Sequence, residues 1–289
     1  MTLNKLNVFQ RPKLNSPRLL LGFFGWMDGN DVSTGTIKYL IEKLQAEELA
    51  HLEPEGFYIY NFPGPMEISA LFRPYTKIEN GIIQTYEAPI NEFFYDEKNN
   101  LILFIGKEPN FSWQEYVDYI FSICSQFGVI QIYFIGSIAG LVPHTREPRF
   151  LCSVSDETIK ASLQQHGIRF INYEGPASIG TYLMVRASQE NLRMLSLITE
   201  IPAYVQGYNP RCIETVTRCL VSILGLHIQL DDLRATSDEF ERKLSEMVQN
   251  QPELAEKVRK LEEDYDDEIF DTEMTDLKEW LEQKGIRVD

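Results

Sequence analysis

Short runs rich in apolar residues alternate with amphipathic segments through the first 226 residues of the chain. Runs of this kind are typical of buried strands. They lie at Arg18–Phe24, Phe57–Tyr60, Ile82–Glu87, Leu101–Ile105, Ile130–Ile135, Phe150–Val154 and Met194–Ile198. Between them, apolar residues spaced three or four apart predict helices. These predicted helices are Thr34–Ala50, Ser112–Cys124 (closed by Gly128), 155–166 (closed by Gly167), Ile179–Ser188 and 210–224.

The segment Ile179–Ser188 suits a strand as well as a helix, and the Gly175-Pro176 turn before it favours a helix. Strands that alternate with helices predict a central sheet covered on both faces. We therefore expect an α/β protein with a three-layer α/β/α fold and a mixed, mostly parallel sheet. Within that sheet, Ile82–Glu87 and Leu101–Ile105 could pair as an antiparallel meander.

The pattern changes after Leu230. Apolar residues follow a heptad-like spacing from Phe240 to Leu261, and Pro252 interrupts it. Proline is favoured in the first turn of a helix, so we expect a helical hairpin whose second helix starts at Pro252 with Asn250 as its cap. Each helix has an apolar stripe that must be buried. Burial on the core of the same chain and burial in a subunit interface both remain open.

Beyond this hairpin, six of the seven residues in Glu262–Glu268 are acidic. The stretch lacks the central glycine of a calcium loop, so we predict a solvated acidic connector instead of a metal site. A last amphipathic helix is predicted at Met274–Lys284, with Leu277, Trp280 and Leu281 on one face. We accordingly divide the chain into an α/β/α core domain, 1–229, and a helical C-terminal extension with an acidic linker, 230–289.

Charge excludes some partners. The chain carries a formal net charge of −16, and residues 227–289 hold 20 acidic and 9 basic side chains, hence −11 of that total. Phosphate backbones and anionic lipid surfaces repel such a protein, so we expect neither nucleic-acid nor membrane binding. The longest apolar runs reach six or seven residues, and the first nine residues lack the apolar segment of a signal peptide.

The four cysteines of the chain are widely spaced and form no CxxC pair. They are expected to be buried, reduced thiols, which agrees with a cytoplasmic protein and argues against a metal site.

The turn after the first predicted strand supplies one set of candidate binding residues: Gly25, Trp26, Asp28, Gly29 and Asp31. It matches neither GxGxxG nor a phosphate loop, and its aspartates repel phosphate. The structural interpretation is a glycine turn in which Asp28, Asn30 or Asp31 caps the following helix.

A second set lies in the segment that follows Ile135, where the loops of α/β sheets meet ligands and partners. Its candidates are Gly136, Ser137, Gly140, His144, Thr145 and Arg146. A general base needs a nucleophile nearby, and no GxSxG motif is present, so we assign no catalytic residue. Two hypotheses remain: a pocket where Asp28, His144 and Arg146 converge, or a structural or interface loop with Arg146 paired to Glu147.

Three segments together resemble the proteasome assembly chaperone family, specifically the prokaryotic relatives of the second eukaryotic assembly chaperone. They are Leu21–Asp31, Gly106–Trp113 and Gly136–Arg146, and Leu261–Asp267 also looks like that family's helical tail. The similarity extends over roughly residues 15–268. No single motif is specific, but their order and spacing are.

The resemblance implies a fold with the topology of nucleoside phosphorylases, and self-association into small homo-oligomers, a trimer being our expectation. Archaeal relatives bind proteasome α-subunits, some through a C-terminal tail of a hydrophobic residue, tyrosine and any residue. This sequence ends Gly-Ile-Arg-Val-Asp289 and lacks that tyrosine.

We therefore expect a non-enzymatic protein-binding or assembly factor that needs no cofactor. Its expected partners are its own copies and proteasome subunits or another protein. The alternative is a phosphorylase- or hydrolase-like small-molecule enzyme that uses Asp28, His144 and Arg146.

Overall fold

The computed structural model describes residues 5–283 except 71, 164–165 and 167, with side chains only as far as residue 269. Among the described residues, nine strands form one sheet in the order β1-β3-β6-β7-β2-β8-β11-β9-β10. The strands of this sheet are β1 (Leu6–Val8), β2 (Arg18–Phe24), β3 (Glu47–Leu52), β6 (Asn91–Asp96), β7 (Leu101–Lys107), β8 (Gln131–Gly140), β9 (Phe150–Val154), β10 (Arg169–Phe170) and β11 (Arg193–Pro202).

The sheet is mixed, and its four central strands are parallel. Strand β2 pairs with β7 on one side and β8 on the other, and β8 pairs with β11. Antiparallel pairs flank this centre, with β6 beside β7 and β9 beside β11. The central strands are buried almost throughout, because helices cover both faces of the sheet.

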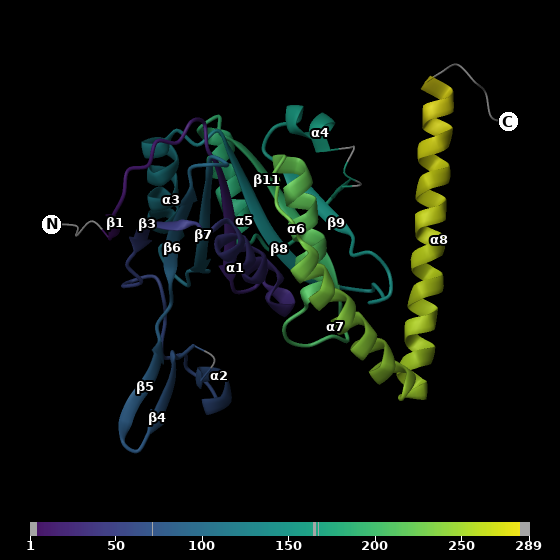
Figure 1. Cartoon of the computed structure of the whole chain (residues 1–289), viewed down its shortest axis with the longest axis horizontal. Coiled ribbons are helices and arrows are strands. Elements are labelled where there is room, and N and C mark those ends of the chain that lie inside the picture. Colours follow the sequence, from purple (N-terminus) through teal and green to yellow (C-terminus); the bar gives the residue numbers. More distant parts are fainter. Residues whose placement is uncertain (1–4, 71, 164–165, 167, 284–289) are drawn as a thin grey trace.

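Helices α3 (Trp113–Phe127) and α5 (Ile179–Gln189) cover one face of the sheet, while α1 (Val32–Leu44) and α6 (Pro210–Leu224) cover the other (Figure 1). Alternate residues of β2 enter two separate cores. Leu19 and Leu21 pack with the first pair of helices and Leu20 with the second. The short helix α4 (Thr158–Leu163) joins the second core. The expected three-layer α/β/α fold is confirmed.

Four predicted elements are wrong at their ends or in kind. The helix predicted to Ala50 ends at Leu44, because Gln45 adopts a left-handed conformation and β3 begins at Glu47. The predicted strand Phe57–Tyr60 is a turn and loop. Strand β8 continues to Gly140, so the first part of the expected loop at 136–148 is strand. The helix predicted over 155–166 is confined to α4, and its predicted stop at Gly167 lies outside the described residues.

The expected meander is also wrong. Strand β5 (Ile82–Glu87) pairs with β4 (Tyr75–Glu79) in a separate ribbon, and the antiparallel neighbour of β7 is β6. Together with α2 (Met66–Ala70), this ribbon projects from the end of the sheet (Figure 1). We call residues 61–90 the arm.

The predicted helical hairpin is present as α7 (Asp231–Gln249) and α8 (Pro252–Gln283). Asn250 ends α7 instead of capping α8. Helix α8 runs without interruption through residues 262–268, so the predicted acidic connector is wrong. The helix predicted at Met274–Lys284 falls in the last part of α8, beyond the described side chains, and the chain end at 284–289 lies outside the described residues.

All four cysteines are buried and unbonded, as predicted. Among the described residues, no helix is long and apolar enough to cross a membrane.

Candidate functional site

The turn between β2 and α1 is held by Asp28. One carboxylate oxygen accepts the backbone amide of Thr34 at 3.1 Å and the other accepts its hydroxyl at 2.7 Å. The predicted capping role of Asp28 is therefore confirmed. Burial raises the pKa of Asp28 to about 6, against the lowering effect of the bonds from Thr34.

This turn is attached to the end of β8. The amide of Ser137 donates to the carbonyl of Met27 at 2.8 Å, and its hydroxyl donates to the carbonyl of Gly29 at 2.7 Å. The glycines allow this close approach: a Cβ at Gly29 would lie 2.6 Å from Ile201, and one at Gly136 would lie 2.7 Å from Ile198. The two candidate segments thus meet here, and the Ser137 hydroxyl is used in a structural bond.

His144 lies on the segment after β8 and is buried. Its Nδ1 lies 2.7 Å from the hydroxyl of Tyr204, which also accepts the His144 amide at 2.8 Å, and its Nε2 lies 3.1 Å from the hydroxyl of Ser245. Both ring nitrogens of His144 are thus within hydrogen-bond distance of a hydroxyl, and each hydroxyl can donate or accept. Burial, with a contribution from Arg211, lowers the pKa of His144, so the ring is neutral near pH 7.

The neighbouring basic residues bind the acidic face of α8. Arg146 forms a two-pronged bond to Asp266, at 2.8 Å for each nitrogen. Arg149 and Arg169 both donate to Glu268, at 2.6 and 2.7 Å. We call Glu262, Asp266 and Glu268 the acidic ladder of α8, because Glu262 also accepts the hydroxyl of Thr145.

The predicted pair between Arg146 and Glu147 is wrong, since Glu147 binds Arg218. The other hydrogen-bonded partner of Glu147 is Tyr265, whose hydroxyl donates to the Glu147 carbonyl at 2.7 Å. The guanidinium of Arg149 lies 4.1 Å from the centre of the Tyr265 ring. The C-terminal helices thus pack in cis on the loop that carries the second set of candidates.

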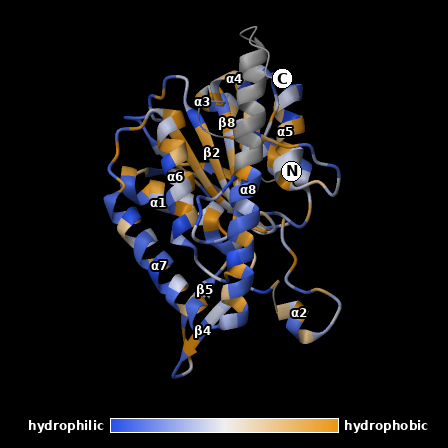
Figure 2. Cartoon of the chain, turned by 90° about the vertical axis from the view of Figure 1, so that its right-hand side faces the viewer, coloured by the Kyte–Doolittle hydropathy of each residue, from blue (hydrophilic) through white to orange (hydrophobic). Residues whose placement is uncertain are grey.

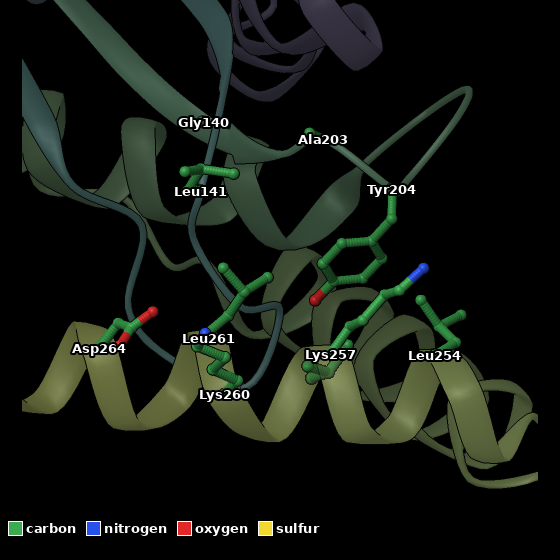
Figure 3. Close-up of a pocket in the computed structure, with 10 residues that line it drawn as sticks. Gly140, Leu141, Ala203, Tyr204, Leu254, Lys257, Lys260, Leu261 and Asp264 are labelled. Carbon is green, nitrogen blue, oxygen red and sulfur yellow. The ribbon is translucent and has the colours of Figure 1, made fainter.

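A cavity of about 450 Å³ lies where α8 passes the ends of β8 and β11 (Figure 3). Its walls are mainly apolar, with Leu141, Ala203 and Tyr204 on the sheet side and Leu254 and Leu261 on α8. Figure 2 views α8 from outside, where hydrophilic residues predominate. Gly140 is the member of the predicted set that lines this cavity.

Exposed aromatic side chains lie on the loops that follow β2 and β7 and on the loop that precedes α5. Trp26, Phe111 and Tyr173 are 61%, 52% and 64% exposed, and we call these three residues the aromatic edge. Glu108 connects their loops, because its carboxylate accepts the Trp26 amide at 3.1 Å and the Ile179 amide at 3.4 Å. A Cβ at Gly25 would lie 2.8 Å from Glu108, so only glycine fits beside it.

The predicted site residues are therefore distributed over three places. Trp26 belongs to the aromatic edge, and Gly25 precedes it. The contact between the β2 turn and β8 contains Asp28, Gly29, Gly136 and Ser137, with the exposed Asp31 beside it. The residues that face α7 and α8 are Gly140, His144, Thr145 and Arg146. Asp28, His144 and Arg146 each bond a different partner. Among the described residues, no group of three or more histidine, cysteine, aspartate or glutamate side chains is placed to hold a metal ion.

Sequence reasoning missed the residues that connect these parts. Tyr204, Ser245 and Tyr265 lie 60 to 118 positions from the residues they bind, so one sequence gives no sign of the pairing. A usable signal was the match between the segment Arg146–Arg149, which holds two arginines, and the acidic ladder, in which Glu262 and Asp266 are four residues apart. Phe111 lies in the segment Gly106–Trp113, which is used above only for the family resemblance.

These features define an α/β/α protein whose sheet end carries exposed aromatic loops and a docked helical hairpin. The family model of the PAC2 family matches residues 22–248. The chain therefore belongs to the PAC2 family. A comparison with curated proteins finds no match.

Solved structures share the fold. A Mycobacterium tuberculosis protein of unknown function, Rv2714, has a TM-score of 0.84 at 20% identity, covering 96% of this chain and 94% of its own. The proteasome-assembly chaperone homologue Rv2125 of the same organism has a TM-score of 0.71 at 23% identity, covering 83% and 99%. PbaB of Pyrococcus furiosus, an archaeal proteasome activator, has a TM-score of 0.60 at 21% identity, covering 84% and 97%.

Proposed function

We propose that this protein is a non-enzymatic assembly factor that binds other protein chains and associates with itself. Membership of the PAC2 family supports this proposal, as do structural neighbours named as a proteasome-assembly chaperone homologue and a proteasome activator. Proteasome subunits are accordingly the first partners to test. For the self-association we propose a trimer, and we propose that residues 1–229 are its folding core.

The aromatic edge is the observation that carries the proposal. Large aromatic side chains dominate the binding energy of protein interfaces, and exposed apolar groups gathered in one place mark such surfaces. Trp26, Phe111 and Tyr173 are each more than half exposed, on loops that Glu108 connects through backbone amides. Loops fixed in this way lose little conformational entropy when a partner binds.

The enzymatic alternative has less support. Its three residues are committed elsewhere: Asp28 to the start of α1, His144 to Tyr204 and Ser245, and Arg146 to Asp266. A general base or an anion-binding arginine must be free to meet a substrate. We therefore do not propose catalysis at this position.

The test measures binding of the purified full chain to the proteasome α-subunits of its own organism, by interferometry. Trp26→Ala is expected to weaken binding by about thirtyfold, since a central aromatic contact is worth roughly 2 kcal/mol or more. Phe9→Ala is the matched control, because Phe9 is 57% exposed but lies beside β1 at the far edge of the sheet. An equal loss of binding in both variants would contradict the proposed surface. No binding by the unmodified chain would contradict the proposed partner.

A further inference from the structure

Another cavity, of about 420 Å³, lies where α8 passes α6 and β9 (Figure 1). Three arginines line it from three different elements. Arg149 precedes β9, Arg169 begins β10, and Arg218 lies on α6. Among the described residues that line this cavity, the one carboxylate is that of Glu147. The cavity is therefore basic, in a chain whose net charge is −16.

The carboxylate of Glu268, on α8, lies between two of these arginines. One of its oxygens accepts from Nη1 of Arg149 at 2.6 Å, and the other accepts from Nη1 of Arg169 at 2.7 Å. Arginines that converge on one small anion are typical of carboxylate and phosphate recognition. The side chain of Glu268 is 51% exposed, so it can leave this position without a change in the core. Glu268 thus occupies the place of an anion between the two guanidinium groups.

Arg149 has a hydrogen-bond donor that Glu268 does not use. The side chain of Arg149 is 12% exposed, and its Nε is buried without a hydrogen-bond partner among the residues that the structure describes. A buried N–H group that lacks an acceptor is unfavourable. The ring of Tyr265, 4.1 Å from the guanidinium, holds that group in place. A phosphate group has three terminal oxygens where a carboxylate has two, so it can accept from a donor that Glu268 leaves unpaired.

Arg146 also binds α8, but it lacks this spare donor. Its Nε and Nη2 each donate to an oxygen of Asp266, so one carboxylate occupies both prongs of the guanidinium. Arg149 offers Glu268 one nitrogen only. An incoming anion therefore gains a bond at Arg149 that it does not gain at Arg146.

We propose that this cavity binds the phosphate group of a small molecule, which displaces the Glu268 carboxylate from Arg149 and Arg169. The site goes beyond the assembly function proposed above. A phosphate monoester carries close to two negative charges near pH 7, so two guanidinium groups attract it more strongly than they attract one carboxylate. The charge of the rest of the chain does not prevent binding, because salt screens exposed charges beyond about 8 Å at physiological ionic strength.

The cavity is larger than a phosphate ion needs. Its volume lies within the range of small-molecule sites, about 300–1,000 Å³. Phe150, Tyr265 and Ile269 give it an apolar wall, which suits the organic part of a phosphate monoester. Free inorganic phosphate shares the same recognition chemistry. The site is also linked to α8, because the displaced carboxylate is one of the contacts that dock this helix.

The experiment measures dissociation constants of inorganic phosphate and of phenyl phosphate for the full chain, by isothermal titration calorimetry at constant ionic strength. Arg169→Gln should weaken binding at least about tenfold, since it removes one charged donor. Glu268→Gln should tighten binding at least about threefold, since it removes the competing charge. Arg146→Gln is the matched control, because it also removes an arginine that docks α8 but does not line this cavity, and should change binding less than about twofold.

Thermal unfolding checks that Arg169→Gln is folded, and Glu268→Gln keeps the test valid if it is not. Tighter binding of phenyl phosphate identifies an organic phosphate as the ligand, whereas equal binding of both probes identifies the free ion; either result supports the site. Absence of binding by both the unmodified chain and Glu268→Gln overturns the proposal, and so does an equal loss in Arg169→Gln and Arg146→Gln.

Hydrogen exchange tests the displacement itself. Saturating phenyl phosphate should speed exchange of the amides of residues 262–268 about as much as Glu268→Gln does without a ligand. Unchanged exchange in the presence of bound ligand, or the same increase with sodium chloride at equal ionic strength, overturns the displacement of Glu268.

Discussion

Removal of one aromatic side chain should release α8 from the core. In Tyr265→Ala, the helix loses a ring that is only 8% exposed, the hydroxyl bond to the Glu147 carbonyl at 2.7 Å, and the contact with the Arg149 guanidinium at 4.1 Å. Burial of the side chain contributes about 1.5–3 kcal/mol, the hydrogen bond about 1, and the cation–π contact about 0.5–1. We expect docking of α8 to weaken by about 3–5 kcal/mol.

The acidic ladder should contribute less to the docking of α8 than Tyr265 does, although it forms more hydrogen bonds and ion pairs. The side chain of Glu268 is 51% exposed, and exposed ion pairs contribute about 0.2–1 kcal/mol each. Burial disfavours the charged carboxylate of Glu268, but bonds from Arg169 and Arg149 outweigh it and hold the pKa below its usual value. Arg149 and Arg169 donate to different oxygens of Glu268, so Glu268→Gln keeps an acceptor for one arginine and removes it for the other. Because these pairs are exposed, we expect a loss of about 1 kcal/mol, smaller still at high salt.

Hydrogen exchange followed by mass spectrometry separates the two effects. Since 1.4 kcal/mol corresponds to a factor of ten, amides of residues 254–268 should exchange more than about a hundredfold faster in Tyr265→Ala and less than about tenfold faster in Glu268→Gln. Amides of the central strand β2 serve as the internal control and should not change. If Glu268→Gln, or 0.5 M salt on the unmodified chain, releases α8 as far as Tyr265→Ala does, then ion pairs hold the helix and our reasoning is refuted.

Two further predictions concern buried polar groups. The pKa of Asp28 is raised to about 6 in the folded protein, so the folded state binds a proton more tightly than the unfolded chain. The free energy of unfolding that this proton contributes is fully present below about pH 4 and is lost as the pH rises through 6. The amide of Asp28→Asn can still accept from the Thr34 backbone. In urea titrations, this variant should therefore gain stability relative to the unmodified chain between pH 4 and 7, by up to about 3 kcal/mol. A difference in stability that does not depend on pH would contradict this prediction. Asn91 is fully buried, accepts from the Tyr116 hydroxyl at 2.7 Å and the Lys107 amide at 3.2 Å, and donates to the Leu52 carbonyl at 3.3 Å. Asn91→Leu removes the side-chain donor to the Leu52 carbonyl, whereas the Lys107 amide keeps the Ile90 carbonyl as an acceptor, and should cost about 2 kcal/mol in the same assay. Tyr58→Phe, which removes one donor to Asn91, should cost about 1 kcal/mol.

The layers of the fold could be predicted because their signals are local. Helix α6 begins at Pro210 and ends before Gly225, and β2 is an unbroken apolar run, so periodicity and turn residues sufficed. The strand predicted at Phe57–Tyr60 is absent for a physical reason. This residue is buried by an edge-on contact with Tyr116, 5.1 Å between ring centres, and its carbonyl accepts the amides of Asn110 and Phe111 instead of those of a neighbouring strand. An apolar residue in a packed loop gives the same pattern as one in a strand.

The candidate site could be predicted only in part, because its decisive contacts are distant in sequence. Six acidic residues among seven, as in Glu262–Glu268, are typical of a solvated connector when the segment is considered alone. Their partners Arg146, Arg149 and Arg169 lie 99 to 120 positions earlier, and only the folded chain shows that they neutralise one side of α8. Asp28 was one of three predicted caps, and it could be included because its partner Thr34 is only six positions away.

The carboxyl end of the parallel strands, where open α/β sheets bind their ligands, is divided between two structures in this protein. The ends of β8 and β11 are covered by the C-terminal helices of the same chain. Helix α7 docks through Ser245 on His144, and α8 docks through Arg146 and the cavity at Gly140. The ends of β2 and β7 stay open and carry Trp26 and Phe111. The Phe57 carbonyl also fixes the Phe111 loop just before the arm begins, so the exposed edge and the arm share one rigid base. The polar groups of one half are thus consumed in cis, and the other half presents aromatic and apolar side chains, which suit a protein surface better than a small polar substrate.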